Sequence, residues 1–314
     1  MPKISVIIPV YNSERYIERC LKSVLTQDFN DIEAIVVNDE TPDQSMEIVS
    51  RIAKQDSRIR IIHNVVRSGP GIARKQGYEA SRGDYLCFLD GDDTLPHNAL
   101  EILYGHAVST DAAIVKGNIE FVKETGYRYS WRKNSLPFGN TKEGVFQALL
   151  VGAISHNLAG TLFKRDLFVS GEYITIPGMT NGEDALLFYQ IVKKTDGSVF
   201  VCDDLVYHYH ENLLSSTHVK LSQNAIDNLV YLYGFIYRNL SDYSHIQKEL
   251  IAYTVRHLNE LYLNYTPENV RTKAQECCCD QFLSFRYRLS CLTPRENIRW
   301  CLKAAIYSLG FKKR

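Results

Sequence analysis

Residues 4–25 read ISVIIPVYNSERYIERCLKSVL, and this stretch decides the fold class of the chain. The run Ile4–Val10 is almost continuously apolar, which is typical of a strand that is buried on both faces. After a turn at Tyr11-Asn12, apolar residues recur at helical spacing from Tyr16 to Leu25. The stretch therefore predicts a buried strand followed by an amphipathic helix.

The same alternation continues along the chain. We expect strands at Glu33–Val37, Arg58–His63 and Asp84–Leu89, with a helix at about residues 72–81 between the last two. Buried strands separated by helices form a parallel sheet, and such sheets bind ligands beyond the carboxyl ends of their strands. Three polar clusters follow strand ends and are predicted to share one crevice: Tyr11-Asn12, Asn38-Asp39 and Asp90 to Asp93.

Composition narrows the possible partners and the organisation of the 314-residue chain. Thirty-six basic residues balance 36 acidic ones, so no global basic field would attract nucleic acid. Long helical periodicities replace the strand pattern from Leu221 onward, which predicts a catalytic α/β domain at 1–218 and a helical region at 219–314. The eight cysteines lack metal-ligand spacing. No secretory leader or membrane-spanning apolar run is evident, so we expect reduced thiols and a cytoplasmic protein.

The cluster Asp90-Gly91-Asp92-Asp93 concentrates three carboxylates within four residues. Such groups repel one another unless a cation or ordered hydrogen bonds offset their charge. Carboxylate oxygens suit Mg²⁺ or Mn²⁺. The alternative is an acidic turn in which Asp93 caps a helix that starts near Pro96.

Four stretches in this order resemble the family-2 glycosyltransferases, over roughly residues 3–215. They are SVIIPVYNSERYIERCLKSVLTQ, EAIVVNDETPDQS, GPGIARKQGYEASRGDYLCFLDGDD and NGEDALLFYQIV. Each string alone is weak, whereas the ordered set is specific. The resemblance implies the GT-A fold, which is an α/β nucleotide-diphospho-sugar transferase fold with a Rossmann-like, mostly parallel sheet, here followed by the helical C-terminal region.

The resemblance also implies a nucleotide-sugar site. Residues that match Pro9, Tyr11 and Asp39 line the base, usually uracil, and Arg74 borders the same pocket. Without the family pattern, Tyr11 could simply pack at a strand end and Asp39 could cap a turn. The second strand end reads NDETPD, where the family commonly has two aspartates and then Gly-Ser-Thr-Asp, so the base contacts can differ.

Acidic residues carry the implied chemistry. Asp90 and Asp92 match the Asp-x-Asp motif, in which the first acid meets the ribose or the sugar and the second binds the metal; Asp93 shares either role. Asp184 matches the general base, with Glu183 beside it, although an acid there could also simply favour the helix dipole. One base and one displacement predict inversion at the anomeric carbon, because a retaining reaction needs a second, nucleophilic carboxylate.

The implied activity is a metal-dependent hexosyl transfer. A sugar would move from a nucleotide-diphospho-sugar, first of all a UDP-sugar, to a glycan or lipid-linked glycan, in bacterial surface polysaccharide or lipopolysaccharide synthesis. The divalent ion would be Mn²⁺ or Mg²⁺. The alternative is a non-catalytic sugar-nucleotide-binding subunit that positions a partner enzyme; the presence of both Asp92 and Asp184 argues against it.

Three further features are predicted near and beyond this site. Alternation puts His208 and His210 on one side of a strand, and the resemblance gives His210 a diphosphate or metal role; the alternative is that both are surface or hydrogen-bonded core residues. Tyr127, Tyr129 and Trp131 could stack on sugars, but a β-hairpin or core packing explains them as well. A basic amphipathic helix over 295–309 either contacts an anionic membrane at its inner, cytoplasmic face or packs on the protein.

Overall fold

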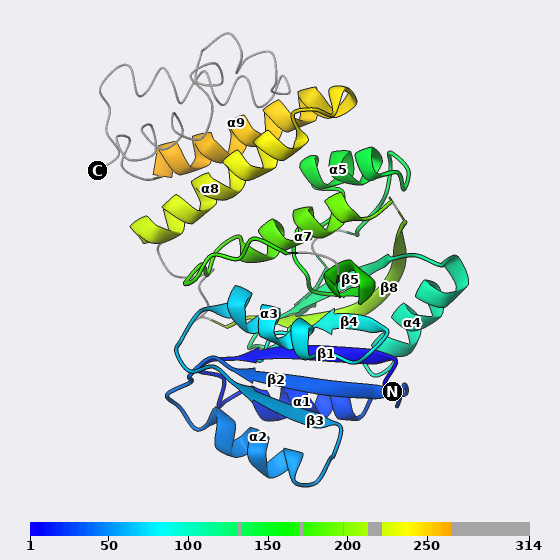
Figure 1. The fold of residues 1–314 in the computed structure, drawn as a ribbon, viewed down its shortest axis with the longest axis vertical. Helices are drawn as coiled ribbons and strands as arrows, with labels where there is room; N and C mark the ends of the chain where they lie inside the picture. Colours follow the sequence, from blue (N-terminus) through cyan, green and yellow to red (C-terminus); the bar gives the residue numbers. More distant parts are fainter. Residues whose placement is uncertain (131–132, 170–171, 197, 213–221, 265–314) are drawn as a thin grey trace. The chain divides into compact units, whose positions relative to one another are not determined.

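A computed structural model describes residues 1–130, 133–169, 172–196, 198–212 and 222–264 of the chain (Figure 1). The chain divides into two compact units, Met1–Asn228 and Leu229–Arg314. This division falls further along the chain than the proposed boundary between residues 218 and 219, within a long helix. The expected membrane-contacting helix, Trp131 and the cysteines from Cys277 onward lie outside the described residues.

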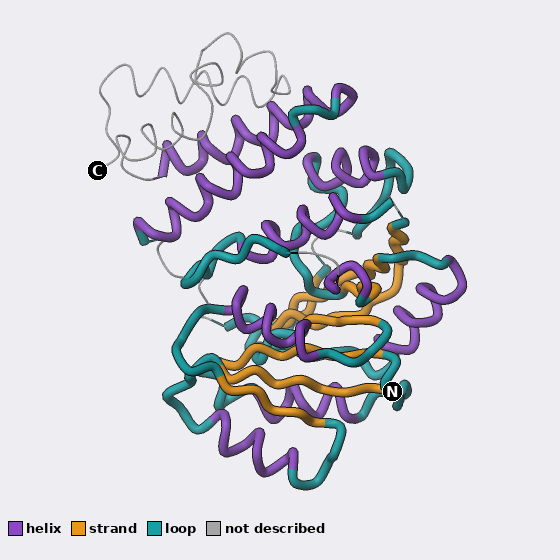
Figure 2. Tube along the Cα trace, in the orientation of Figure 1, coloured by secondary structure: helices purple, strands orange, loops and turns teal. Residues whose placement is uncertain are grey.

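The first half of the larger unit alternates strands and helices, and Figure 2 shows how they are arranged as layers. The elements in order are β1 (Ile4–Val10), α1 (Ile17–Leu25), β2 (Ile32–Asn38), α2 (Ser45–Ala53), β3 (Ile59–His63), α3 (Pro70–Ala80), β4 (Tyr85–Phe88) and α4 (Ala99–Thr110). The predicted strands and the first helices are confirmed to within a residue or two. These elements were predictable because each is an apolar or amphipathic run of sequence that is bounded by turn residues.

The rest of the unit adds strands of both directions. These elements are β5 (Ile114–Val122), β6 (Arg128–Tyr129), α5 (Lys142–Leu150), β7 (Thr161–Lys164), α6 (Asp166–Val169), α7 (Glu183–Lys194) and β8 (Val199–His210). The stretch TLFKRDLF is strand only over β7, because Asp166 begins a short helix. The aromatic group near Tyr129 belongs to a β5–β6 hairpin, in which Phe121 stacks on Tyr129 with ring centroids 5.3 Å apart.

One eight-stranded sheet joins these strands, in the order β3-β2-β1-β4-β7-β5-β6, with β8 paired to β5. The neighbours β3, β2, β1 and β4 are all parallel, as predicted. Strand β7 is antiparallel to both β4 and β5, whereas β8 is parallel to β5. The carboxyl ends of β1, β2 and β4 therefore meet at one edge of the sheet.

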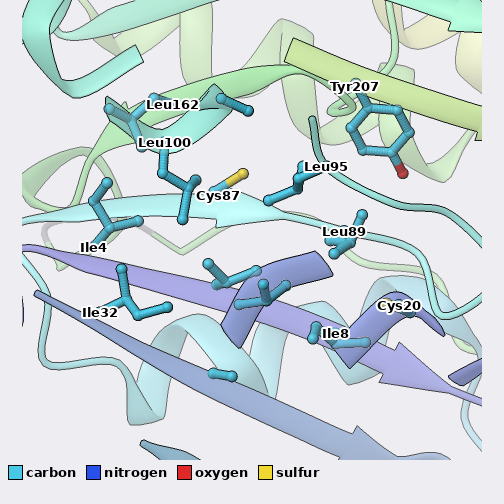
Figure 3. Packing of buried hydrophobic residues seen from close by; sticks show 14 of the residues in the cluster. Ile4, Ile8, Cys20, Ile32, Cys87, Leu89, Leu95, Leu100, Leu162 and Tyr207 are labelled. Atoms are coloured by element: carbon cyan, nitrogen blue, oxygen red, sulfur yellow. The ribbon is translucent and has the colours of Figure 1, made fainter. Parts of the chain in front are cut away.

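Strand β1 is buried on both faces because helices cover both. Its alternate residues from Ile4 to Val10 join a cluster with Cys20 and Leu21 of α1 and Leu100 of α4, part of which Figure 3 shows. Ile7 faces α3 instead, where it touches Gly77 so closely that a β-carbon at that position would collide with it. A glycine thus lets α3 approach the sheet.

The described part of the second unit is helical. Helix α8 (Gln223–Leu240) starts in the first unit and is followed by the short turn η1 (Ser244–Ile246) and by α9 (Gln247–Asn264). Tyr233 of α8 contacts Tyr253 and His257 of α9, with ring centroids 6.0 and 4.9 Å apart. None of the helices in the described residues is long and apolar enough to span a membrane.

Candidate active site

The polar clusters at the ends of β1, β2 and β4 surround one cavity of about 730 Å³. Pro9 and Tyr11 come from the end of β1, Asp39 from β2, and Asp90 and Asp92 from β4. Arg74 of α3 and Glu183 of α7 also line it. Of the predicted site residues, these seven therefore line one cavity, as the topology suggested.

The ring of Tyr11 is covered by a cation. The guanidinium carbon of Arg67 lies 3.9 Å from the ring centroid, and both residues line the cavity. The backbone N–H of Arg67 donates to Glu40 Oε2 at 2.9 Å, and Glu40 adopts a left-handed φ of 56° at a position where the family commonly has glycine. Arg67 was not predicted, since nothing in the local sequence indicates that it reaches β1.

The carboxylate of Asp39 is held by protein donors. Its Oδ1 accepts from Asn64 Nδ2 at 2.8 Å and from the N–H of Ser68 at 2.9 Å, and its Oδ2 accepts from the N–H of Gly69 at 2.8 Å. Asp39 is buried. It thus fixes the loop that carries Arg67, while one side of the residue still faces the cavity.

Arg74 is the hub of the acidic side. Its Nη2 donates to Asp90 Oδ1 at 2.7 Å, and its Nη1 lies 3.2 Å from Glu183 Oε1 and 2.6 Å from Asp184 Oδ1. The arginine side chain is only 5% exposed. Arg74 lines the same cavity as Tyr11, and the structure also pairs it with the carboxylates that the resemblance assigns to sugar binding and proton transfer.

The turn after β4 presents Asp92 to the cavity. Asn212, which follows β8, donates to Asp92 Oδ2 at 2.9 Å. The Arg19 guanidinium donates to the backbone carbonyl of Asp92 at 2.7 Å. Both contacts hold the turn in place, and Asp92 itself lines the cavity, which is where a ligand would meet it.

Asp93 is a structural group. It is 1% exposed; its Oδ2 accepts from the Tyr207 hydroxyl at 2.7 Å and its Oδ1 from the N–H of His210 at 2.8 Å. Tyr207 also accepts from the N–H of Asp90 at 3.3 Å. Asp93 therefore ties the turn to β8 and is not among the residues that line the cavity; its share in donor binding stays a prediction.

The two histidines of β8 lie on one side of the strand, as alternation predicted. The Oγ1 of Thr94 is 2.9 Å from His210 Nε2 and 3.5 Å from His208 Nδ1. Burial, followed by the nearby Arg19, lowers the pKa of His210 to about 4. His210 is therefore neutral at pH 7, which is the form that binds a metal.

Helix α7 delivers the two remaining acids in its first turn. Gly182, with a left-handed φ of 86°, lets the chain turn into the helix directly before Glu183. Glu183 lines the main cavity, whereas Asp184 lines a small adjoining pocket with Leu158. The backbone of Leu158 lowers the pKa of Asp184, against the larger effect of burial, which raises it. The placement in the first turn also favours both charges through the helix dipole.

The acids of the site carry more negative charge than their surroundings balance. Burial, and then the Asp184 carboxylate, raises the pKa of Glu183 to about 7. Burial also raises the pKa of Asp184, and burial and the Asp90 charge raise that of Asp92. Perturbed carboxyls that gather in one cavity are typical of functional sites. A divalent cation would relieve this repulsion.

Among the residues that the structure describes, one further group could hold a metal. It consists of His106, Cys202 and Asp204, whose possible ligand atoms lie within 4.8 Å of one another. His106 Nε2 is 3.1 Å from Asp204 Oδ2, and Asp204 also hydrogen-bonds Cys202. These residues satisfy one another. They come from α4 and β8, and none of the three lines the main cavity.

Comparison with known sequences gives the family. Residues 5–168 match the family model described as glycosyl transferase family 2. An uncharacterized glycosyltransferase, EpsJ of Bacillus subtilis, is 30% identical over 268 residues, which cover 82% of this chain and 76% of EpsJ. A GalNAc(5)-diNAcBac-PP-undecaprenol beta-1,3-glucosyltransferase of Campylobacter jejuni is 37% identical over 125 residues, which cover 40% of each chain.

Solved structures agree on the fold. Residues 1–349 of S. aureus TarS, in complex with UDP-GlcNAc, superpose with a TM-score of 0.75 at 18% identity, covering 99% of this chain and 93% of the TarS 1–349 chain. The mannosyltransferase PcManGT of Pyrobaculum calidifontis, in complex with GDP-Man and Mn²⁺, superposes with a TM-score of 0.55 at 16% identity. The match covers 99% of this chain and 88% of the PcManGT chain. The mostly parallel sheet and these likenesses confirm the expected GT-A fold, and the family match confirms that the chain belongs to glycosyl transferase family 2.

Proposed function

We propose that the chain is an inverting, metal-dependent hexosyltransferase that moves a sugar from a nucleotide-diphospho-sugar, first of all a UDP-sugar, to a glycan acceptor. One observation carries the proposal: an aromatic ring, the Asp90–Asp92 pair and Glu183 line a single cavity of about 730 Å³ at the carboxyl edge of the sheet. Nucleotide-binding α/β proteins bind their ligands at this edge. The complex of TarS with UDP-GlcNAc supports the choice of nucleotide.

In this proposal the donor spans the cavity from β1 to α7. The base lies at Tyr11 and Pro9, where it can stack on the aromatic ring. The Arg67 guanidinium, which covers the Tyr11 ring, either makes room for the base or packs over it. Asp39 shapes this subsite through the loop that it holds. Asp90 accepts from ribose or sugar hydroxyls on the side that Arg74 leaves open.

The residues fit a divalent ion. Asp92 offers a hard oxygen ligand beside Asp93, and burial raises the pKa of both carboxyls; neutral His210 donates its backbone N–H to Asp93 in the same turn. The complex of PcManGT with GDP-Man and Mn²⁺ supports this choice of ion, and Mg²⁺ suits the same ligands. When bound, such an ion neutralises the charge that develops on the β-phosphate as it leaves.

Asp184 is proposed as the general base. Its carboxylate accepts the proton of the acceptor hydroxyl while that oxygen forms a bond to the anomeric carbon. The bond from the anomeric carbon to the phosphate oxygen breaks, and its electron pair leaves with the nucleoside diphosphate. Arg74 keeps Asp184 ionised and Glu183 beside it. A single displacement inverts the anomeric configuration.

The biological setting is proposed from the relatives. The C. jejuni relative is named for an undecaprenol-linked acceptor, and the family resemblance suggests surface polysaccharide or lipopolysaccharide assembly. A lipid-linked glycan would be met at the cytoplasmic face of the cell membrane, which predicts peripheral contact with that surface.

The experiment measures UDP release from a panel of UDP-sugars with a glycan acceptor, with Mn²⁺ and with excess chelator. We expect release to need the ion, Asp92→Ala to weaken UDP binding in calorimetry, and Asp184→Asn to lower transfer about 10²- to 10⁴-fold while UDP binding persists. Asp203→Asn, on an 81% exposed side chain, is the matched control.

Each outcome assigns a role. Transfer at the parent rate by Asp184→Asn, with loss in Glu183→Gln, would move the base to Glu183, which lines the main cavity. Equal UDP affinity with Mn²⁺ and with chelator would remove the ion from donor binding. UDP binding without transfer to any acceptor would favour a non-catalytic binding subunit.

A further inference from the structure

Lys116 is a lysine buried in the middle of β5, with no exposed surface. Its Nζ donates to the backbone carbonyl of Asn157 at 2.9 Å and to Thr161 Oγ1 at 2.9 Å. The Asn157 side chain and the carbonyl of Ala159 lie at 3.3 and 3.2 Å. A buried ammonium is tolerated only when its donors are satisfied, and these four acceptors satisfy it.

All four acceptors belong to one segment, residues 157–161, which links α5 to β7. The segment is held a second time where the N–H of Gly117 donates to the carbonyl of Gly160 at 2.9 Å. Leu158, in the middle of the segment, lines the small pocket together with Asp184, and its backbone favours the ionised form of that carboxyl. Lys116 therefore fixes the short piece of backbone that lies against the proposed base.

Lys116 also contacts the helix that carries Asp184. Its Nζ lies 5.1 Å from the ring centroid of Phe188 on α7, which is a cation–π distance. Phe188 is fully buried and follows Asp184 by one helical turn, so both lie on one face of α7. One ammonium thus contacts both elements that position Asp184, and its charge favours the ionised carboxylate.

We propose that Lys116 is a positioning residue for the transfer step: it holds residues 157–161 and α7 so that the Asp184 carboxylate stays ionised and oriented toward the acceptor. This inference rests on the proposed function. Lys116 lines neither the main cavity nor the small pocket beside Asp184, so it acts through Asp184 and does not touch substrate.

Because the charge on Lys116 depends on pH, the proposal predicts how kcat changes with pH. Burial lowers the pKa of Lys116 to about 7, and Asp184 is the charged group that opposes this shift. On the elements around it, Glu183 pairs with Arg74, and the ring of His156 lies 5.5 Å from that of Tyr189. As pH rises through about 7, Lys116 loses a donor and its charge, so kcat should fall on the alkaline side.

The test compares kcat for transfer, UDP affinity and the pH profile of kcat in four proteins: the parent, Lys116→Met, Thr161→Val and Lys164→Met. Lys164 is the matched control, because it lies on the neighbouring strand β7 and its ammonium pairs with Asp111 at 2.6 Å instead of with residues 157–161. We expect Lys116→Met to lower kcat about 10²-fold, as a displaced catalytic group does, with UDP affinity unchanged and the alkaline limb lost.

Thr161→Val keeps the proposal testable if Lys116→Met does not fold. It removes one acceptor of the ammonium, so the alkaline limb should move to lower pH while UDP affinity stays at the parent value. A parent profile without an alkaline limb near pH 7, or a limb that neither variant moves, would overturn the role of Lys116 and leave the proposed function intact. A parent that transfers no sugar would overturn both.

Discussion

At the scale of single residues, Tyr207 has the clearest structural duty in the site. Its ring lies beside the aliphatic cluster in Figure 3, and its hydroxyl bonds both Asp93 and the N–H of Asp90. Tyr207→Phe leaves these two buried groups one partner short. We expect the free energy of unfolding to fall by about 1–3 kcal/mol and UDP affinity with Mn²⁺ to fall as well, because the turn that presents Asp92 is loosened.

Thermal unfolding and calorimetry check this prediction. Tyr173→Phe is the matched control, since its buried hydroxyl donates to the carbonyl of Leu167 at 2.6 Å, outside the cavity. The control should lose stability and keep its UDP affinity. If Tyr207→Phe keeps its affinity too, the contact with Asp93 does not shape the donor site.

Site residues were predictable where they follow strand ends and hidden where their partners are distant in the sequence. Asp92 and Asp184 stand in motifs that can be quoted from the chain. Tyr207 reaches Asp93 across 114 positions and Lys116 reaches Asn157 across 41, and such pairings depend on the order of strands in the sheet. A lone lysine inside the apolar run of β5 was the signal that could have revealed Lys116.

At the scale of elements, the buried acid Glu183 in the first turn of α7 lowers the stability of the fold at neutral pH. Glu183 binds its proton more tightly in the folded chain, because burial and Asp184 raise its pKa from 4.5 to about 7. Its favourable contribution to folding is therefore complete below pH 4.5 and is lost as pH rises to about 7. Glu183→Gln should unfold at about the parent temperature at pH 4.5.

As the pH increases, the free energy of unfolding of Glu183→Gln should rise above that of the parent. Above pH 7 we expect a difference of about 1–2 kcal/mol. Each unit of pKa shift corresponds to roughly 1.4 kcal/mol, and the contact with Arg74 that the variant loses reduces the total. Thermal melts between pH 4.5 and 8 measure this. Glu143→Gln, on an exposed first-turn acid of α5, should show no such divergence. If the unfolding temperatures of the parent and Glu183→Gln change with pH in the same way, the ionised Glu183 side chain does not destabilise α7.

Local sequence pattern was enough to predict the strands β1 to β4 and their pairing, but not the strands of the other half of the sheet. The strands β1 to β4 are apolar runs between helices, so their parallel pairing could be inferred from the chain. The antiparallel insertion of β7 between β4 and β5 could not, because β7 has only four residues and its partners are set by packing. The β8 strand, with its pairing to β5, was anticipated only at its histidine end.

At the scale of the whole molecule, the zero net charge conceals an uneven distribution. From Arg295 onward there are six basic residues and one acid, which leaves 30 basic and 35 acidic residues in the rest of the chain. The proposed catalytic acids lie in that larger part and would be repelled by an anionic surface. Any electrostatic attachment to a membrane therefore depends on the last 20 residues of the sequence.

Neutralising the six basic residues to Gln at full chain length should abolish binding to anionic vesicles and leave donor hydrolysis unchanged. The residues are Arg295, Arg299, Lys303, Lys312, Lys313 and Arg314. Each basic side chain near an anionic surface contributes about 1 kcal/mol, so six of them can hold the enzyme reversibly. Salt should weaken this attachment, because at physiological ionic strength screening limits the field to about 8 Å.

Co-sedimentation with vesicles at two salt concentrations measures this, and the control neutralises as many exposed basic residues elsewhere, among them Lys54, Arg82 and Lys133. The control protein should sediment like the parent. If the parent itself stays in the supernatant at low salt, the basic C-terminus has another role, and the proposed lipid-linked acceptor would have to reach the enzyme without help from surface charge. If the parent and the neutralised protein sediment equally, apolar burial rather than charge holds the chain at the membrane, since only the charges differ between the two.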